Sequence, residues 1–169
     1  MEKNNIVLIG MPGCGKSTVG VLLAKRIRKK FVDTDLFIQE QEERLLCEII
    51  EEDGLERFKE IENEVNATVV TENSVIAPGG SVIYGEEAMR HLKEIACVVY
   101  LKLSFESVAN RLGDLTKRGV AFRPGQDLKS LYEERCPLYE KYADIVVDCD
   151  GLELGETLEK VMERVSKSA

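Results

Sequence analysis

The sequence predicts an α/β fold in which a parallel sheet is covered by helices on both faces. Short apolar runs alternate with longer segments of helical periodicity, which is the arrangement of a doubly wound α/β domain. Ile6–Ile9 is a continuous apolar run, as expected of a strand that is buried on both faces. The chain has 169 residues, 44% of them hydrophobic, so we expect residues 1–169 to form one domain around one core.

The remaining elements follow from the spacing of apolar residues and from turn residues. A helix is predicted from Ser17 to Lys29, and a strand at Phe31–Thr34 completes a βαβ unit, which requires a parallel sheet. Residues 36–70 have a helical pattern with a break near Asp53 and Gly54, whereas residues 113–127 are polar and predict a mobile loop. The further strands are expected at Ser74–Ala77, Cys97–Leu103 and Ile145–Asp148, and the further helices at Glu86–Glu94, Phe105–Leu112, Leu128–Tyr142 and Gly155–Lys167.

The composition excludes several classes of protein. The net charge is −8 and no basic stripe is present, which disfavours binding to nucleic acid. No uncharged apolar run approaches the roughly 18 residues of a membrane-spanning helix, and the first residues lack the pattern of a signal peptide. The five cysteines are scattered without a Cys-x-x-Cys pair, which is typical of a reducing compartment. We therefore expect a cytoplasmic protein without nucleic-acid or membrane partners, acting as a monomer.

A phosphate-binding loop follows the first predicted strand. Residues 10–17, GMPGCGKS, match the pattern G-x-x-x-x-G-K-[S/T], which would occur by chance in well under ~1% of chains of this length. The glycines let backbone amides point inward at a helix N-terminus, where they bind anionic phosphate. Lys16 can reach the β- and γ-phosphates, and the hydroxyl of Ser17 can bind Mg²⁺. The loop predicts binding of a nucleoside triphosphate.

Two aspartates follow the second predicted strand. Asp33 and Asp35 lie where the carboxyl ends of parallel strands border the ligand crevice. One carboxylate could support the Mg²⁺ site, and the other could orient or deprotonate an acceptor hydroxyl. The alternative is that they only cap the following helix and complement its dipole. The phosphate-binding loop upstream favours the first interpretation.

The sequence as a whole resembles the shikimate kinase family. The resemblance covers nearly the whole chain and is carried, in order, by the phosphate-binding loop, Phe31–Asp35, Gly54…Phe58…Glu62, Gly79-Gly80, Val98–Leu101 and Arg135…Pro137-Leu138-Tyr139. It implies a three-layer P-loop fold, like that of nucleoside monophosphate kinases, with a five-stranded parallel sheet in the order 2-3-1-4-5. It also implies a substrate-binding helical region at about 35–70, a lid at about 113–127, and MgATP-dependent phosphorylation of a small hydroxy acid, with shikimate the first choice.

The resemblance also implies roles for individual residues. Catalytic roles fall on Lys16, Asp35 and Arg118. The residues implied to bind ATP are Gly13, Cys14, Gly15, Lys16, Ser17, Thr18, Arg111 and Arg118, with Ser17 and Asp33 at the Mg²⁺ site. Those implied to bind the acceptor are Asp35, Lys59, Glu62, Gly79, Gly80 and Arg135, where Glu62 steadies the cation at position 59 and Arg135 grips a carboxylate.

Three positions depart from the family pattern, all in or near the acceptor half. Lys59 replaces an arginine, Ser81 replaces the last glycine of a Gly-Gly-Gly turn, and Arg118 is followed by Gly119 instead of proline. A lysine is a flexible point charge and cannot grip a carboxylate through two parallel bonds as an arginine does. Another small hydroxy carboxylate, such as homoserine, is therefore an alternative acceptor.

Other classes of P-loop protein fit the sequence less well. A regulatory GTPase needs an Asn-Lys-x-Asp segment, which the sequence lacks. A nucleotide kinase needs more arginines near the substrate helix than Arg57 provides. A non-catalytic ATP-binding module has no use for the combination of Lys16, Ser17, Asp33 and Asp35.

Overall fold

The computed structural model describes residues 3–112 and 123–168 of the chain. Its strands are β1 (Asn5–Ile9), β2 (Lys30–Asp33), β3 (Ser74–Ala77), β4 (Ala96–Lys102) and β5 (Ile145–Asp148). Its helices are α1 (Lys16–Arg26), α2 (Thr34–Glu42), α3 (Leu46–Asp53), α4 (Leu55–Thr68), α5 (Glu86–Ile95), α6 (Phe105–Arg111), α7 (Leu128–Tyr142) and α8 (Leu154–Ser168), with a short 3₁₀ turn η1 (Val82–Tyr84). Within these residues no helix is long and apolar enough to cross a membrane.

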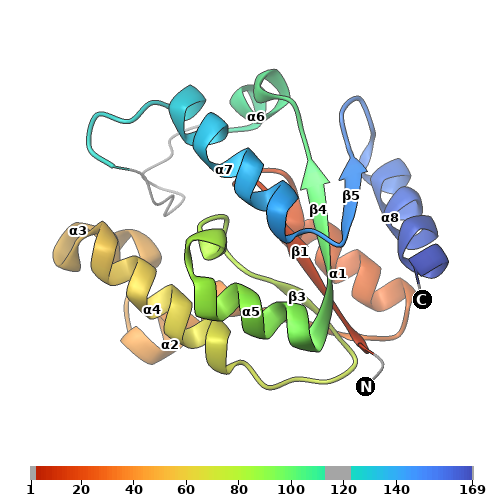
Figure 1. Cartoon of the computed structure of the whole chain (residues 1–169), viewed down its shortest axis with the longest axis horizontal. Coiled ribbons are helices and arrows are strands. Elements are labelled where there is room, and N and C mark those ends of the chain that lie inside the picture. The colour runs from red at the N-terminus through yellow and green to blue at the C-terminus, as the bar shows by residue number, and fades with distance from the viewer. Residues whose placement is uncertain (1–2, 113–122, 169) are drawn as a thin grey trace.

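The five strands form one parallel sheet, as the sequence predicts. The strand order is β2-β3-β1-β4-β5, which confirms the expected 2-3-1-4-5 arrangement. Helix α1 packs against β3 and α8, while α5 and α7 pack against β4 on the other face, so the fold has three layers (Figure 1). Helices α2, α3 and α4 pack against one another, and α4 also lies along α5.

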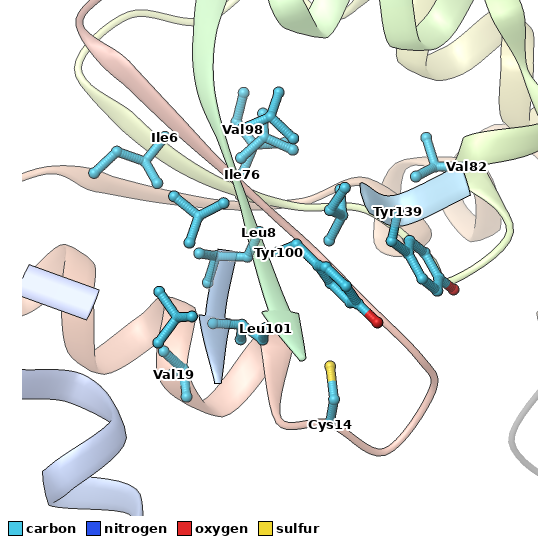
Figure 2. Close-up of a cluster of buried hydrophobic side chains, with 14 of the residues drawn as sticks. Ile6, Leu8, Cys14, Val19, Ile76, Val82, Val98, Tyr100, Leu101 and Tyr139 are labelled. Atoms are coloured by element: carbon cyan, nitrogen blue, oxygen red, sulfur yellow. The ribbon is translucent and has the colours of Figure 1, made fainter. Parts of the chain in front are cut away.

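The core is built around the central strands. Every residue of β1 is buried, because helices cover both faces of the sheet. The rings of Tyr100 in β4 and Tyr139 in α7 stack with centroids 5.1 Å apart, above Cys14 of the phosphate-binding loop (Figure 2). A smaller apolar cluster, centred on Phe58, holds α2, α3 and α4 together. Both clusters support the loops at the carboxyl edge of the sheet.

Three differences from the sequence prediction have a clear local cause, whereas the elements outside the α2–α4 region otherwise begin and end within one residue of the predicted bounds. Helix α1 ends at Arg26 instead of Lys29, because Arg28 adopts a left-handed conformation (φ 58°) and the amide of Lys29 donates to the carbonyl of Ala24 (2.8 Å). The helical region has a second break at Glu43, which is also left-handed (φ 54°). Thr34, predicted at the end of a strand, begins α2.

Candidate active site

A cavity of about 460 Å³ opens at the carboxyl ends of β1, β2 and β3. The topology places it there, because β1 lies beside β3 and β3 beside β2, so the loops that follow the three strands meet. The predicted site residues that line the cavity are Gly13, Gly15, Lys16, Ser17, Thr18, Asp35, Glu62, Gly79, Gly80 and Arg135. The sequence analysis did not assign to the site the other lining residues, which are Pro12, Leu46, Phe58, Ala77, Pro78 and Ser81.

The phosphate-binding loop forms one wall of the cavity. Gly15 caps α1 with a left-handed conformation (φ 93°) that a residue with a side chain rarely adopts. The Nζ atom of Lys16 donates to the carbonyls of Gly10 (2.9 Å) and Met11 (3.0 Å), and the residue is only 9% exposed. Ser17 and Thr18 are exposed at the start of α1. The wall therefore presents a helix N-terminus, an ammonium group and two hydroxyls to a bound anion.

Cys14 belongs to this loop, but its side chain does not line the cavity. The side chain is buried against the core, and its Sγ lies 3.8 Å from the Nζ of Lys16. Only the backbone of Cys14 can contribute to the phosphate-binding role that the resemblance implies.

Asp35 faces the loop from the start of α2. Its amide donates to the Oδ1 of Asp33 (3.0 Å), so Asp33 is the N-cap of α2 and does not line the cavity. The Oδ1 of Asp35 is buried and has no hydrogen-bond partner among the residues that the structure describes. Burial, together with the charge of Asp33, raises the pKa of Asp35 to about 6, against the opposing effect of Lys16. The carboxylate of Asp35 is therefore chemically able to accept a proton near neutral pH.

Glu62 reaches the same point from α4. It is only 2% exposed, and its Oε1 accepts a hydrogen bond from the hydroxyl of Ser81 (2.5 Å). Its Oε2 has no hydrogen-bond partner in the described part of the chain. A Cβ atom on Gly79 would lie 2.7 Å from this Oε2 and 2.9 Å from the Oδ1 of Asp35, so both oxygens converge above Gly79.

The pKa of Glu62 reflects its burial and its closeness to Asp35. Burial and the nearby charge of Asp35 raise the pKa of Glu62 to about 7, while the hydrogen bond from Ser81 and the charge of Arg135 lower it. The resemblance implied that Glu62 would hold the cation at position 59. In the structure the contact of Glu62 is Ser81, which stands where the family has glycine.

The sequence analysis did not single out Tyr84, whose ring contacts two cations in the acceptor region. Arg135, on helix α7, lines the cavity and is only 1% exposed. Its Cζ lies 5.4 Å from the centre of the Tyr84 ring. Lys59 does not line the cavity; its Nζ lies 4.4 Å from the centre of the same ring. Nothing in the local pattern of η1 indicated that Tyr84 would contact both cations.

The acceptor loop and the phosphate-binding loop are in direct contact. A Cβ atom on Gly80 would lie 3.0 Å from the Cδ of Pro12 and 3.4 Å from the carbonyl oxygen of Gly10. The carbonyl of Gly80 also accepts a hydrogen bond from the hydroxyl of Tyr139 (2.5 Å). The two loops thus lie close together, and a side chain at position 80 would require Pro12 and the Nη1 of Arg135, 3.1 Å from the added Cβ atom, to move by a few tenths of an ångström.

The two remaining predicted residues lie apart from the cavity or outside the described residues. Arg111 is exposed at the end of α6 and does not line the cavity. Arg118 lies outside the described residues, as do residues 113–122 of the predicted lid.

Relatives of this chain share its full length. A protein from Moorella thermoacetica named shikimate kinase is 37% identical over 161 residues, which cover 94% of this chain and 92% of the relative. The shikimate kinase of Thermodesulfovibrio yellowstonii is 36% identical over 166 residues, covering 96% of this chain and 95% of the relative.

Solved structures show the same fold. The crystal structure of shikimate kinase from Aquifex aeolicus superimposes with a TM-score of 0.82 at 32% identity, covering 97% of each chain. Shikimate kinase from Acinetobacter baumannii in complex with shikimate has the same fold, with a TM-score of 0.81 at 24% identity and coverage of 97% of this chain and 93% of that one. The family model described as shikimate kinase matches residues 12–166, and the chain therefore belongs to the shikimate kinase family.

Proposed function

We propose that the chain transfers the γ-phosphate of MgATP to the 3-hydroxyl group of shikimate, producing shikimate 3-phosphate and ADP. The observation that carries this proposal is that Asp35, Arg135 and the phosphate-binding loop all line the same cavity. One wall suits a triphosphate, and the opposite wall offers a proton acceptor and a cation to a hydroxy acid. Family membership and the full-length similarity to shikimate kinases favour shikimate as that acid.

The phosphate donor would be held by the loop wall. The amides at the start of α1 and the Nζ of Lys16 would bind the β- and γ-phosphates, with Lys16 exchanging its bonds to the carbonyls of Gly10 and Met11 for the phosphate oxygens. The hydroxyl of Ser17 is an oxygen ligand that lines the cavity and would suit Mg²⁺, whereas the carboxylate of Asp33, which caps α2 and does not line the cavity, would support the ion only indirectly. Bound Mg²⁺ would neutralise charge on the phosphates.

The acceptor would bind between Asp35 and Arg135. Arg135 would pair with the carboxylate of shikimate, which brings the hydroxyl to the Oδ1 of Asp35. As the hydroxyl oxygen bonds to the γ-phosphorus, its proton passes to Asp35 and the bond to the bridging oxygen of ADP breaks. Positioning and charge stabilisation supply most of the rate enhancement in such a reaction.

Two further assignments and the setting of the reaction complete the proposal. We infer that Arg118, outside the described residues, stabilises charge on the transferring phosphate, and that Arg111 packs against adenine. We also infer that the chain acts as a monomer in the cytoplasm. One polypeptide supplies every side chain named above, and its five cysteines are free thiols, as suits a reducing compartment.

A coupled assay of ADP release tests the acceptor. Shikimate, homoserine and a nucleoside monophosphate would be compared at saturating MgATP, and we expect kcat/KM for shikimate to exceed the others by at least about 100-fold. Asp35→Asn should lose the activity, whereas Glu72→Gln, a change of an exposed carboxylate, should not. Preference for homoserine or for the nucleotide would contradict the proposal.

A further inference from the structure

We propose that Tyr84 is a positioning residue for the acceptor carboxylate, because its ring holds the guanidinium of Arg135 and the ammonium of Lys59 on the cationic side of the acceptor site. This inference rests on the proposed function, since it concerns the acceptor of the same cavity. It assigns to an uncharged residue of η1 the task of arranging two charges that come from α4 and α7.

Tyr84 is itself firmly held. Its hydroxyl donates to the Oε1 of Glu134 (2.7 Å), the neighbour of Arg135 on α7. Glu134 also accepts two hydrogen bonds from the Nη2 of Arg123 (both 2.9 Å) and one from the Nε2 of Gln126 (2.9 Å). The ring therefore has a fixed orientation, and a fixed ring can restrict the cations that contact it.

The ring of Tyr84 makes a cation–π contact with each of the two cations. The Nζ of Lys59 lies 4.4 Å and the Cζ of Arg135 lies 5.4 Å from its centroid, within the range of about 6 Å over which a cation is attracted to a ring face. Arg135 is almost fully buried, so water screens its contact little. Burial lowers the pKa of Arg135, but Tyr139 and Tyr84 together outweigh this effect and hold the pKa above its ordinary value. The guanidinium therefore remains charged at the cavity wall.

The ring of Tyr84 restricts Lys59 more than it restricts the buried Arg135, because Lys59 has few other contacts within the described residues that would hold it. A lysine at this position is a flexible point charge, and its ion-pair partner Glu56 lies 3.7 Å away with a side chain that is 84% exposed. Exposed pairs of this kind contribute little to position a side chain. The Tyr84 ring is thus the contact that keeps Lys59 near the acceptor site, where the family pattern has an arginine. Tyr84 restricts the position of the ammonium group, although it does not supply the two parallel bonds that an arginine would form.

The proposal predicts a loss of acceptor binding without a loss of chemistry. Tyr84→Leu should raise the KM for shikimate about 10-fold, with kcat and the KM for ATP unchanged within about twofold. Tyr84→Phe keeps the ring but loses the hydroxyl that bonds to Glu134, so its KM should lie between that of the original chain and that of Tyr84→Leu. Tyr142→Leu is the matched control, because Tyr142 also contacts a cation, Lys141 (5.1 Å), which unlike Arg135 does not line the cavity.

An acceptor without a charge separates positioning from a structural effect. With the methyl ester of shikimate, Tyr84→Leu should change KM by less than about twofold, because no carboxylate remains to be held. Lys59→Met should likewise raise the KM for shikimate, by about fivefold, and leave that for the ester unchanged; it serves as the second test if Tyr84→Leu does not fold.

The outcomes distinguish this inference from the proposed function. If the original chain phosphorylates shikimate but Tyr84→Leu and Lys59→Met leave the KM unchanged, only the role of Tyr84 is overturned. An equal loss for shikimate and the ester, or a loss in Tyr84→Phe as large as in Tyr84→Leu, also overturns it. If the original chain does not phosphorylate shikimate, the proposed function itself fails.

Discussion

Replacing Gly79 with alanine tests whether the two carboxyls must converge above the acceptor loop. The new methyl group would lie 2.7 Å from the Oε2 of Glu62 and 2.9 Å from the Oδ1 of Asp35, whereas ordinary contacts begin at 3.4 Å. Glu62 cannot yield easily, because it is buried and its other oxygen is bonded to Ser81. Both carboxyls must therefore shift by roughly half an ångström or more, and a misplacement of about 1 Å costs about 100-fold in rate.

We therefore expect Gly79→Ala to lower kcat for shikimate phosphorylation by about 100-fold, equivalent to about 3 kcal/mol of transition-state stabilisation. The dissociation constant for ATP should change little, because the phosphate-binding loop is not displaced. The measurements are the coupled ADP-release assay and nucleotide binding followed by fluorescence. Gly155→Ala is the matched control, since nothing lies within 4 Å of a Cβ atom there. A kcat within twofold of the original for Gly79→Ala would refute the argument.

Three further predictions concern the charged groups. Lys16→Ala should lower kcat/KM at least about 100-fold in the same assay, because a cation on the phosphates is lost. Asp35→Asn should lower kcat by about 100-fold or more with ATP binding retained, and kcat of the original chain should fall as the pH drops below about 6, where Asp35 becomes protonated. Ser81→Ala should raise the pKa of Glu62 further, so urea denaturation should show a larger loss of stability at pH 8 than at pH 5.

The sign of the last prediction follows from linkage. The pKa of Glu62 is raised in the folded chain to about 7, so the folded state binds more protons than the unfolded state between about pH 4.5 and 7. The contribution of Glu62 to the free energy of unfolding is therefore fully present at low pH and is lost as the pH rises through this range. Equal losses at pH 5 and pH 8 in Ser81→Ala would contradict the assigned role of the serine hydroxyl.

The sheet and the phosphate-binding wall could be predicted from the sequence because their signals are local. The apolar run at Ile6–Ile9 indicated a buried strand, and the glycine pattern that ends in Lys16 and Ser17 indicated the loop that follows it. Asp35 could be placed at the cavity because it follows a strand of a parallel sheet. These inferences need only the neighbours of each residue along the chain.

The acceptor wall could not be predicted in the same way, because its contacts join distant segments. Ser81 and Glu62 are 19 residues apart, and Tyr84 and Glu134 are 50 residues apart. Position 59 shows the difficulty: its charge could be recognised in the sequence, but the aromatic ring that it contacts could not. The end of α1 at Arg26 depends on a left-handed residue that helix propensity does not reveal.

The packing of the Gly80 loop against Pro12 and Gly10 bears on how such a kinase can diversify. A larger residue at position 80 would require Pro12 of the phosphate-binding loop and the guanidinium of Arg135 to move, so a change of this glycine would affect the donor and acceptor walls together. Variation is left to side chains that approach the acceptor from the surrounding helices and the 3₁₀ turn. Lys59 and Ser81, which depart from the family pattern, lie on α4 and just before η1, and the phosphate-binding motif at residues 10–17 is intact beside them.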